Sequence, residues 1–108
     1  MYIAMNRFRI CRGREAEFER IWQERDTYLS EVPGFKSFQL LKGPEAADHT
    51  LYASHSVWES YQAFMDWTRS DEFRMAHAQA GTSKELYLGP PQFEGFEAVM
   101  DQGPSYHF

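Results

Sequence analysis

The sequence predicts an α+β fold, a ferredoxin-like plait with the element order βαββαβ, in which an antiparallel four-stranded sheet carries two helices on one face. Three observations predict it: four short stretches suit strands, two longer segments have apolar residues at helical spacing, and the two kinds occur in that order. The 108 residues, of which 43% are hydrophobic and 17% aromatic, suffice for one core. We therefore expect a single domain.

The first part of the chain predicts a strand, a helix and a second strand. Residues 2–10 alternate in character, and one face of that strand carries Tyr2, Ala4, Asn6, Phe8 and Ile10. Residues 13–29 have glutamates in the first turns, where the helix dipole favours them, and an apolar stripe of Phe18, Ile21, Trp22 and Leu29. The Pro-Gly pair of "VPGF" (32–35) predicts a turn before the strand "FKSFQLLK" (35–42).

The second part predicts a strand, a helical region and a last strand. The loop "GPEAADH" (43–49) precedes the strand "TLYASHSVW" (50–58), which is rich in residues that suit a pleated surface. Ser60 can cap a helix through "YQAFMDW", and Gly81 is placed to end the helical region after His77. We expect a long loop over "GTSKELYLGPP" (81–91) and a strand over "QFEGFEAVM" (92–100).

Apolar residues on both faces of the predicted strands indicate a partner. They include Ile3 and Met5 against Ala4 and Phe8, and Phe93 and Val99 against Phe96 and Ala98. Helices would cover only one face of the sheet, so apolar residues on the other face would contact water in a single chain. We expect a homodimer joined sheet to sheet, that is, a dimeric α/β barrel.

Charge and cysteine content exclude several classes of function. A net charge of −5 and a pI near 5.3 argue against a nucleic-acid partner, which requires a basic stripe. No apolar run approaches the roughly 20 residues of a membrane span, and the first residues lack a signal sequence, so we expect a cytoplasmic protein without a membrane partner. Cys11 is the only cysteine, which excludes an intrachain disulfide; it is either a small filler at a strand end or a reactive thiol.

Asn6 and His77 are the first candidates for a functional site. Asn6 shares a strand face with apolar residues, and burying an unpartnered amide costs roughly 1–3 kcal/mol. Its amide is either satisfied by neighbouring backbone or directed into a cavity where a ligand completes its hydrogen bonds. His77 lies one turn after Phe73, beside the small residues Ala76 and Ala80, and is either a residue near a helix C-terminus or a ligand.

The other three histidines are weaker candidates. His55 alternates with apolar residues on a predicted strand, which favours a packed core side chain. His49 lies in a loop beside Asp48, and His107 lies in the tail.

A motif joins these candidates. Residues 56–77, "SVWESYQAFMDWTRSDEFRMAH", contain W-x-S, A-F-x-x-W, S-x-x-F and A-H elements in series. Together with Asn6, they give a sequence that resembles the IsdG-like heme-degrading monooxygenases of the antibiotic biosynthesis monooxygenase superfamily, small dimeric ferredoxin-like proteins. "PGF" (33–35) and "LLKGPEAADHTLYASHSVWES" (40–60) look closest to the rhizobial HmuQ type. The resemblance covers residues 1 to about 100, which implies one domain over 1–100 and leaves 101–108 as a C-terminal tail.

The resemblance implies heme as both substrate and cofactor, O2 as oxidant, and an external reductant such as an electron-donor reductase. It implies that His77 is the proximal ligand to heme iron, Asn6 a distal hydrogen-bond donor to iron-bound oxygen, and Trp67 a distal wedge against the porphyrin. Phe64 matches an apolar pocket position. Arg25 matches a basic residue near the propionates; the alternative is a solvated helix charge.

These roles require a break in the second helical region. A straight helix would separate residues 67 and 77 by roughly 15 Å along its axis and about 80° around it, so they could not address one macrocycle from opposite sides. Ser70 in "TRSD" can cap a new helix that begins with Asp71 and Glu72. We therefore expect two helices instead of one.

Three functions are compatible with the sequence. Oxidative heme cleavage is favoured; a cofactorless quinol or polyketide monooxygenase would not need His77, and a heme carrier would not need Asn6 and Trp67. The sequence leaves open which meso carbon is cut, whether a biliverdin or a further oxidised bilin results, and whether carbon monoxide or formaldehyde is released.

Overall fold

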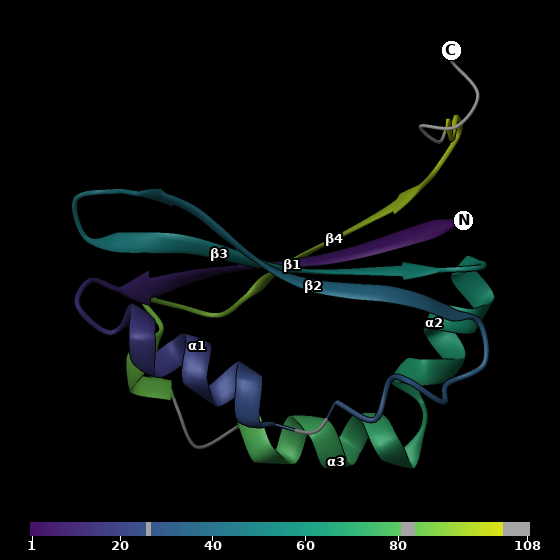
Figure 1. Ribbon diagram of the computed structural model, residues 1–108, viewed down its shortest axis with the longest axis horizontal. Coiled ribbons are helices and arrows are strands. Elements are labelled where there is room, and N and C mark those ends of the chain that lie inside the picture. Colours follow the sequence, from purple (N-terminus) through teal and green to yellow (C-terminus); the bar gives the residue numbers. More distant parts are fainter. Residues whose placement is uncertain (26, 81–83, 103–108) are drawn as a thin grey trace.

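The computed structural model describes residues 1–25, 27–80 and 84–102, with all their side chains except those of 77–80 and 84. Within this part of the chain, the elements in order are β1 Tyr2–Cys11, α1 Glu15–Glu24, β2 Phe35–Glu45, β3 His49–Trp58, α2 Tyr61–Thr68, α3 Asp71–Ala80, the 3₁₀ turn η1 Lys84–Leu86, and β4 Gln92–Glu97. The strands form one antiparallel sheet in the order β2-β3-β1-β4. Figure 1 shows α1, α2 and α3 together on one face of this sheet. The predicted α+β plait is confirmed.

The strand register decides which residues face the helices. Asn6 lies opposite Ser54 on β3 and Phe93 on β4, and Ala4 lies opposite Ser56 in the same ladder. Residues opposite each other in antiparallel strands share a face. Tyr2, Ala4, Phe8 and Ile10 are buried, so this is the inner face, toward the helices.

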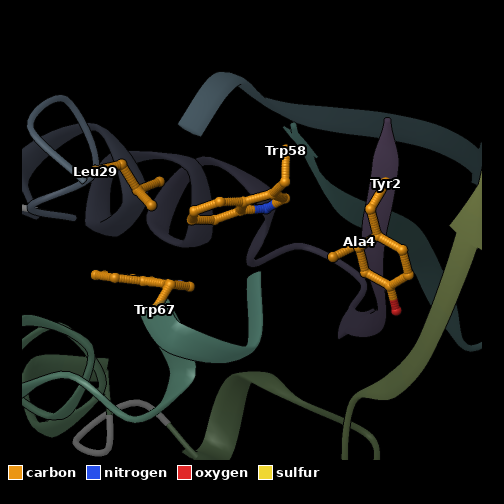
Figure 2. Packing of buried hydrophobic residues seen from close by; sticks show 5 residues of the cluster. All are labelled: Tyr2, Ala4, Leu29, Trp58 and Trp67. Carbon is orange, nitrogen blue, oxygen red and sulfur yellow. The ribbon is translucent and has the colours of Figure 1, made fainter. Parts of the chain in front are cut away.

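Two clusters of buried residues fill the space between the sheet and the helices. The first consists of Tyr2, Ala4, Leu29, Trp58 and Trp67. In Figure 2 the two indoles of this cluster face each other, with Leu29 beside them. The second, toward the end of β1, consists of Phe8, Ile10, Phe18, Tyr52 and Leu86.

The predicted break after Trp67 is confirmed. α2 ends at Thr68 and α3 begins at Asp71. The Ser70 hydroxyl accepts a hydrogen bond from the Phe73 N–H at 3.1 Å, as an N-cap does, and donates one to the Trp67 carbonyl at 2.7 Å. One side chain therefore stabilises both the end of α2 and the start of α3.

The first helix is shorter than predicted, because α1 ends at Glu24. Arg25 has extended backbone (φ −83°, ψ 144°), and Tyr28 has a positive φ of 60°, so the chain leaves the helical conformation before Leu29. Leu29 is only 7% exposed, yet it reaches the first cluster from the segment after the helix. Its spacing from Trp22 coincides with a helical stripe, but tertiary packing buries it.

The two edge strands also differ in length from the prediction. β4 ends at Glu97, not at residue 100, and the next N–H, that of Ala98, donates to the Met1 carbonyl at 2.9 Å. β2 extends to Glu45 and includes Pro44, which an edge strand tolerates because one side of its backbone is unpaired. η1 lies within the segment that was expected to be a loop.

The outer face of the sheet carries apolar and polar side chains together. It includes Ile3, Met5, Val57 and Phe96, placed there by the strand register. Phe96 is 48% exposed in the single chain. No helix among the described residues has the length and apolar character needed to cross a membrane.

Candidate functional site

A cavity of about 1030 Å³ lies between the inner face of the sheet and the helices, lined by members of both clusters. Its floor includes Asn6, Phe8, Ser54 and Phe93 from the sheet, and its walls come from the end of α1, from α2 and α3, and from residues 87 and 89–91. The volume is at the upper end of the roughly 300–1,000 Å³ of small-molecule sites. Four of the five candidate residues, Arg25, Asn6, Phe64 and Trp67, line this one cavity.

Asn6 is in the middle of β1 and is partly buried. Its Cα partners are Ser54 and Phe93, so its side chain lies on the floor of the cavity. No hydrogen bond from the Asn6 side chain to another described side chain or backbone group is found in the structure. Of the two sequence interpretations, the structure favours an amide directed into a cavity.

Trp67 forms part of the cavity wall and is held rigidly. It lies in the last turn of α2 and is 7% exposed. Its ring centroid is 6.2 Å from that of Trp58, with 26° between the planes, and 5.4 Å from that of Phe73 in an edge-to-face contact. Trp67 also lines a second cavity of about 840 Å³, together with residues of α2, of α3 and of the segment 28–34. It therefore belongs to the lining of both cavities.

Phe64, one turn before Trp67, supplies an apolar surface to the cavity. Its ring stacks on that of Phe93 at 5.7 Å with 12° between the planes, and contacts Trp58 edge-to-face at 5.7 Å. These flat rings suit a flat apolar ligand.

Arg25 is the one basic residue among the described residues of the cavity lining. Its Cζ lies 4.1 Å from the Trp22 ring centroid, and its Nη2 donates to the Ala76 carbonyl of α3 at 3.3 Å. Its Nε is buried and has no hydrogen-bond partner among the described residues. Burial lowers the pKa of the guanidinium, an effect that Tyr87 opposes. The alternative of a solvated helix charge is therefore wrong: Arg25 is a partly buried cation to which an anionic ligand group would be complementary.

His77 lies on α3, directly after the buried Ala76, but its side chain is outside the described residues. Its role as iron ligand stays a prediction, and His107 is likewise outside the described part of the chain.

The remaining candidates lie away from the cavity. His55 is opposite Met5 and Gln39 on the outer face of the sheet, and its Nδ1 is 2.7 Å from Gln39 Oε1. The expectation of a packed core histidine is wrong, since the register turns it away from the helices. The Nδ1 of His49 is 2.6 Å from the carboxylate of Asp48.

Cys11, at the end of β1, is partly buried and its Sγ lies 3.6 Å from the Glu85 carbonyl.

The sequence analysis did not assign Ser54, Tyr87 or Trp22 to the site, although all three line the cavity. Ser54 was visible as a polar residue on a strand, but its position opposite Asn6 depends on the register. Tyr87 comes from the expected loop, and burial raises the pKa of its phenol, while Arg25 and Trp22 lower it. Trp22 was assigned to an apolar stripe, and its indole nitrogen has no hydrogen-bond partner among the described residues.

The arrangement suits a large, flat, mostly apolar molecule that carries an acidic group. Aromatic side chains line the walls, and Asn6 and Ser54 offer polar groups on the floor. The part of the lining that the structure describes contains no carboxylate. A ligand carboxylate would find its counter-charge at Arg25.

Comparisons with known proteins agree with this geometry. Residues 1–79 match the family model of the antibiotic biosynthesis monooxygenases. The chain is 36% identical over 82 residues to a heme-degrading monooxygenase of Listeria monocytogenes, which covers 70% of this chain and 68% of that protein. It is 28% identical over 90 residues to heme oxygenase (staphylobilin-producing) 1 of Staphylococcus aureus, which covers 82% of each chain.

A solved structure extends the similarity to the whole fold. The heme degrader MhuD of Mycobacterium tuberculosis, with two hemes bound in its active site, superimposes with a TM-score of 0.72 at 28% identity. The match covers 95% of this chain and all of that one, 100%. The resemblance to heme-degrading proteins of this superfamily is confirmed, whereas the HmuQ type stays a prediction.

Proposed function

Because the chain belongs to the antibiotic biosynthesis monooxygenase family, we propose that it is a heme-degrading monooxygenase of the IsdG-like kind. It binds heme in the cavity between sheet and helices and cleaves the porphyrin oxidatively with O2 and electrons from an external reductant, releasing iron and a bilin. The observation that carries this proposal is the single cavity lined by Asn6, Phe64, Trp67 and Arg25. The names of the similar proteins, which describe heme degradation, support heme as the substrate of this chain as well.

The proposed division of roles rests on the resemblance to heme-degrading monooxygenases and, for Asn6, Trp67, Phe64 and Arg25, also on their positions in the cavity lining. His77 would hold the heme iron, which supplies the activation of O2. Asn6 would donate an amide hydrogen bond from the floor of the cavity toward the side of the macrocycle where O2 reacts. An amide donates a hydrogen bond without releasing its proton, which keeps the oxygen available for attack on the ring.

The aromatic wall would shape the substrate. Trp67 is fixed by Trp58 and Phe73, so its edge cannot yield when a porphyrin enters. The indole would press on a bound porphyrin and thereby influence which part of the ring reacts. Phe64 would cover the apolar ring, and Arg25 would pair with a propionate.

Further parts of the proposal concern the setting of the reaction. We infer a homodimer joined through the outer sheet face, an electron-donor reductase as partner, and a cytoplasmic role in iron acquisition. We also infer that residues 1–100 form one domain and that 101–108 are a tail.

The test uses absorption spectroscopy on the full chain. Heme is added first, and ascorbate is then added in air. Heme cleavage predicts a Soret band that appears and then decays, with a bilin identified by mass spectrometry. A Soret band that persists would identify a heme carrier, and no Soret band would favour a cofactorless monooxygenase; either result contradicts the proposal.

A further inference from the structure

One end of the cavity carries buried hydrogen-bond donors that lack acceptors. Among the described residues, two buried side-chain nitrogens have no hydrogen-bond partner, Trp22 Nε1 and Arg25 Nε. Both residues line the main cavity, and the Arg25 Cζ lies only 4.1 Å from the Trp22 ring centroid. A buried donor without a partner costs roughly 1–3 kcal/mol, and more when charged. An acceptor supplied by a ligand would remove this cost at both nitrogens.

The surroundings indicate that this acceptor is an anion. Among the described residues that line the cavity there is no carboxylate, and Arg25 makes no ion pair with a described acidic side chain. Tyr87 also lines the cavity; burial raises the pKa of its phenol, while the Arg25 charge and the Trp22 N–H lower it. The indole is close to the phenol oxygen, yet no hydrogen bond of acceptable geometry joins them. A carboxylate would accept from both unpaired donors.

We propose that Trp22 determines substrate specificity: its indole N–H and the Arg25 Nε–H together bind one carboxylate of a tetrapyrrole, so that the site selects free acids over esters. The inference rests on the proposed function and adds Trp22 to the binding site. The Trp22 ring is stacked on Phe38 at 5.6 Å with 17° between the planes, which fixes the direction of its N–H. Arg25 also donates to the Ala76 carbonyl, so the anchored carboxylate is linked to the helix that carries His77.

The test compares heme with heme dimethyl ester, in which both carboxylates are blocked, by Soret titration of the full chain. The parent protein should bind heme at least about tenfold more tightly than the ester, since a charge-assisted hydrogen bond contributes about 1.5–3 kcal/mol. Trp22→Phe keeps the ring stacked on Phe38 and removes only the N–H donor and part of the ring. It should reduce the preference for the acid by about tenfold through weaker heme binding, with ester binding little changed.

Trp58→Phe is the matched control, because its indole nitrogen already donates to the Ser56 hydroxyl at 2.9 Å. This variant should retain the parent's preference for the acid. Equal affinity of the parent for heme and ester overturns the inference without any variant, and so does an unchanged preference in Trp22→Phe. If heme gives no Soret band with the parent, the proposed function fails first and the inference with it.

Discussion

At Trp67, an effect of substitution on stability can be separated from an effect on the proposed activity. Trp67 is 7% exposed and contacts Trp58 and Phe73 at ring-centroid distances of 6.2 and 5.4 Å. Truncation of such a residue to alanine costs about 3–5 kcal/mol, against roughly 5–15 kcal/mol for the free energy of unfolding of a whole domain. Alanine would also enlarge the two cavities of about 1030 and 840 Å³ that Trp67 lines. Trp67→Ala therefore confounds activity with stability.

Trp67→Phe avoids this problem. It removes the equivalent of two to three ring atoms, and at about 0.8 kcal/mol per buried methylene the expected loss of stability is about 2 kcal/mol. The variant should stay folded and bind heme, because Phe64 and Arg25 remain in place. A smaller ring exerts less pressure on the porphyrin, so we expect turnover to fall by far more than the unfolded fraction explains. The mixture of cleavage isomers should change as well.

The assay measures urea unfolding, heme affinity, turnover and isomer composition on the same preparation. Trp58→Phe is the control, since it trims the stacked partner, which is fully buried at 0% exposure. Turnover that falls equally in both variants, in step with stability and with an unchanged isomer mixture, would refute the role of Trp67 as a wedge.

Four further predictions concern single features of the molecule. Asn6→Ala should leave heme affinity and thermal stability near the parent values while bilin formation is lost; degradation at the parent rate would contradict its role. His77→Ala should retain the fold but lose most heme affinity and all turnover, and an unchanged histidine-ligated spectrum would assign the iron to another residue. Light scattering should give about twice the chain mass of 12.7 kDa, and a stable monomer at micromolar concentration would exclude the sheet-to-sheet dimer. The Thr50 hydroxyl donates to Glu15 Oε2 at 2.7 Å and lowers the pKa of that carboxyl below 4.5, so this contribution to stability is present above pH 4.5 and disappears as the pH falls through the lowered pKa. Thr50→Val should therefore lower the Tm at neutral pH, and the Tm values of variant and parent should converge in acid. A difference in Tm that stays constant with pH would contradict this prediction.

Local signals in the sequence were sufficient to predict the helices and strands and two features of the site, the face on which Asn6 lies and the break between α2 and α3. Alternation along 2–10 placed Asn6 on the face of Ala4 and Phe8, because successive side chains of any strand point to opposite faces. Ser70 predicted the break between α2 and α3, because an N-cap acts through the backbone of the next three residues. Both inferences depend only on near neighbours in the chain.

The motif placed Phe64 and Trp67 in one helix, but only the fold brings that helix over Asn6 to form the cavity. Leu29 has helical spacing from Trp22, but it lies in the segment after α1. It is buried there because that non-helical segment also lets its side chain contact Trp58 and Trp67. The position of Ser54 opposite Asn6 required the register of β1 and β3, which no short window of sequence specifies.

The sequence by itself thus determined the plait, the face of Asn6 and the division of the helical region, since hydrophobic period and capping act over a few residues. Tertiary structure alone decided that the Trp22 indole nitrogen and the Arg25 Nε are buried without a hydrogen-bond partner among the described residues. It also decided that another nitrogen of Arg25 reaches the Ala76 carbonyl, 51 residues away in the chain. Periodicity reports which face of an element is apolar, whereas the burial and pairing of a polar atom depend on which distant elements pack against it.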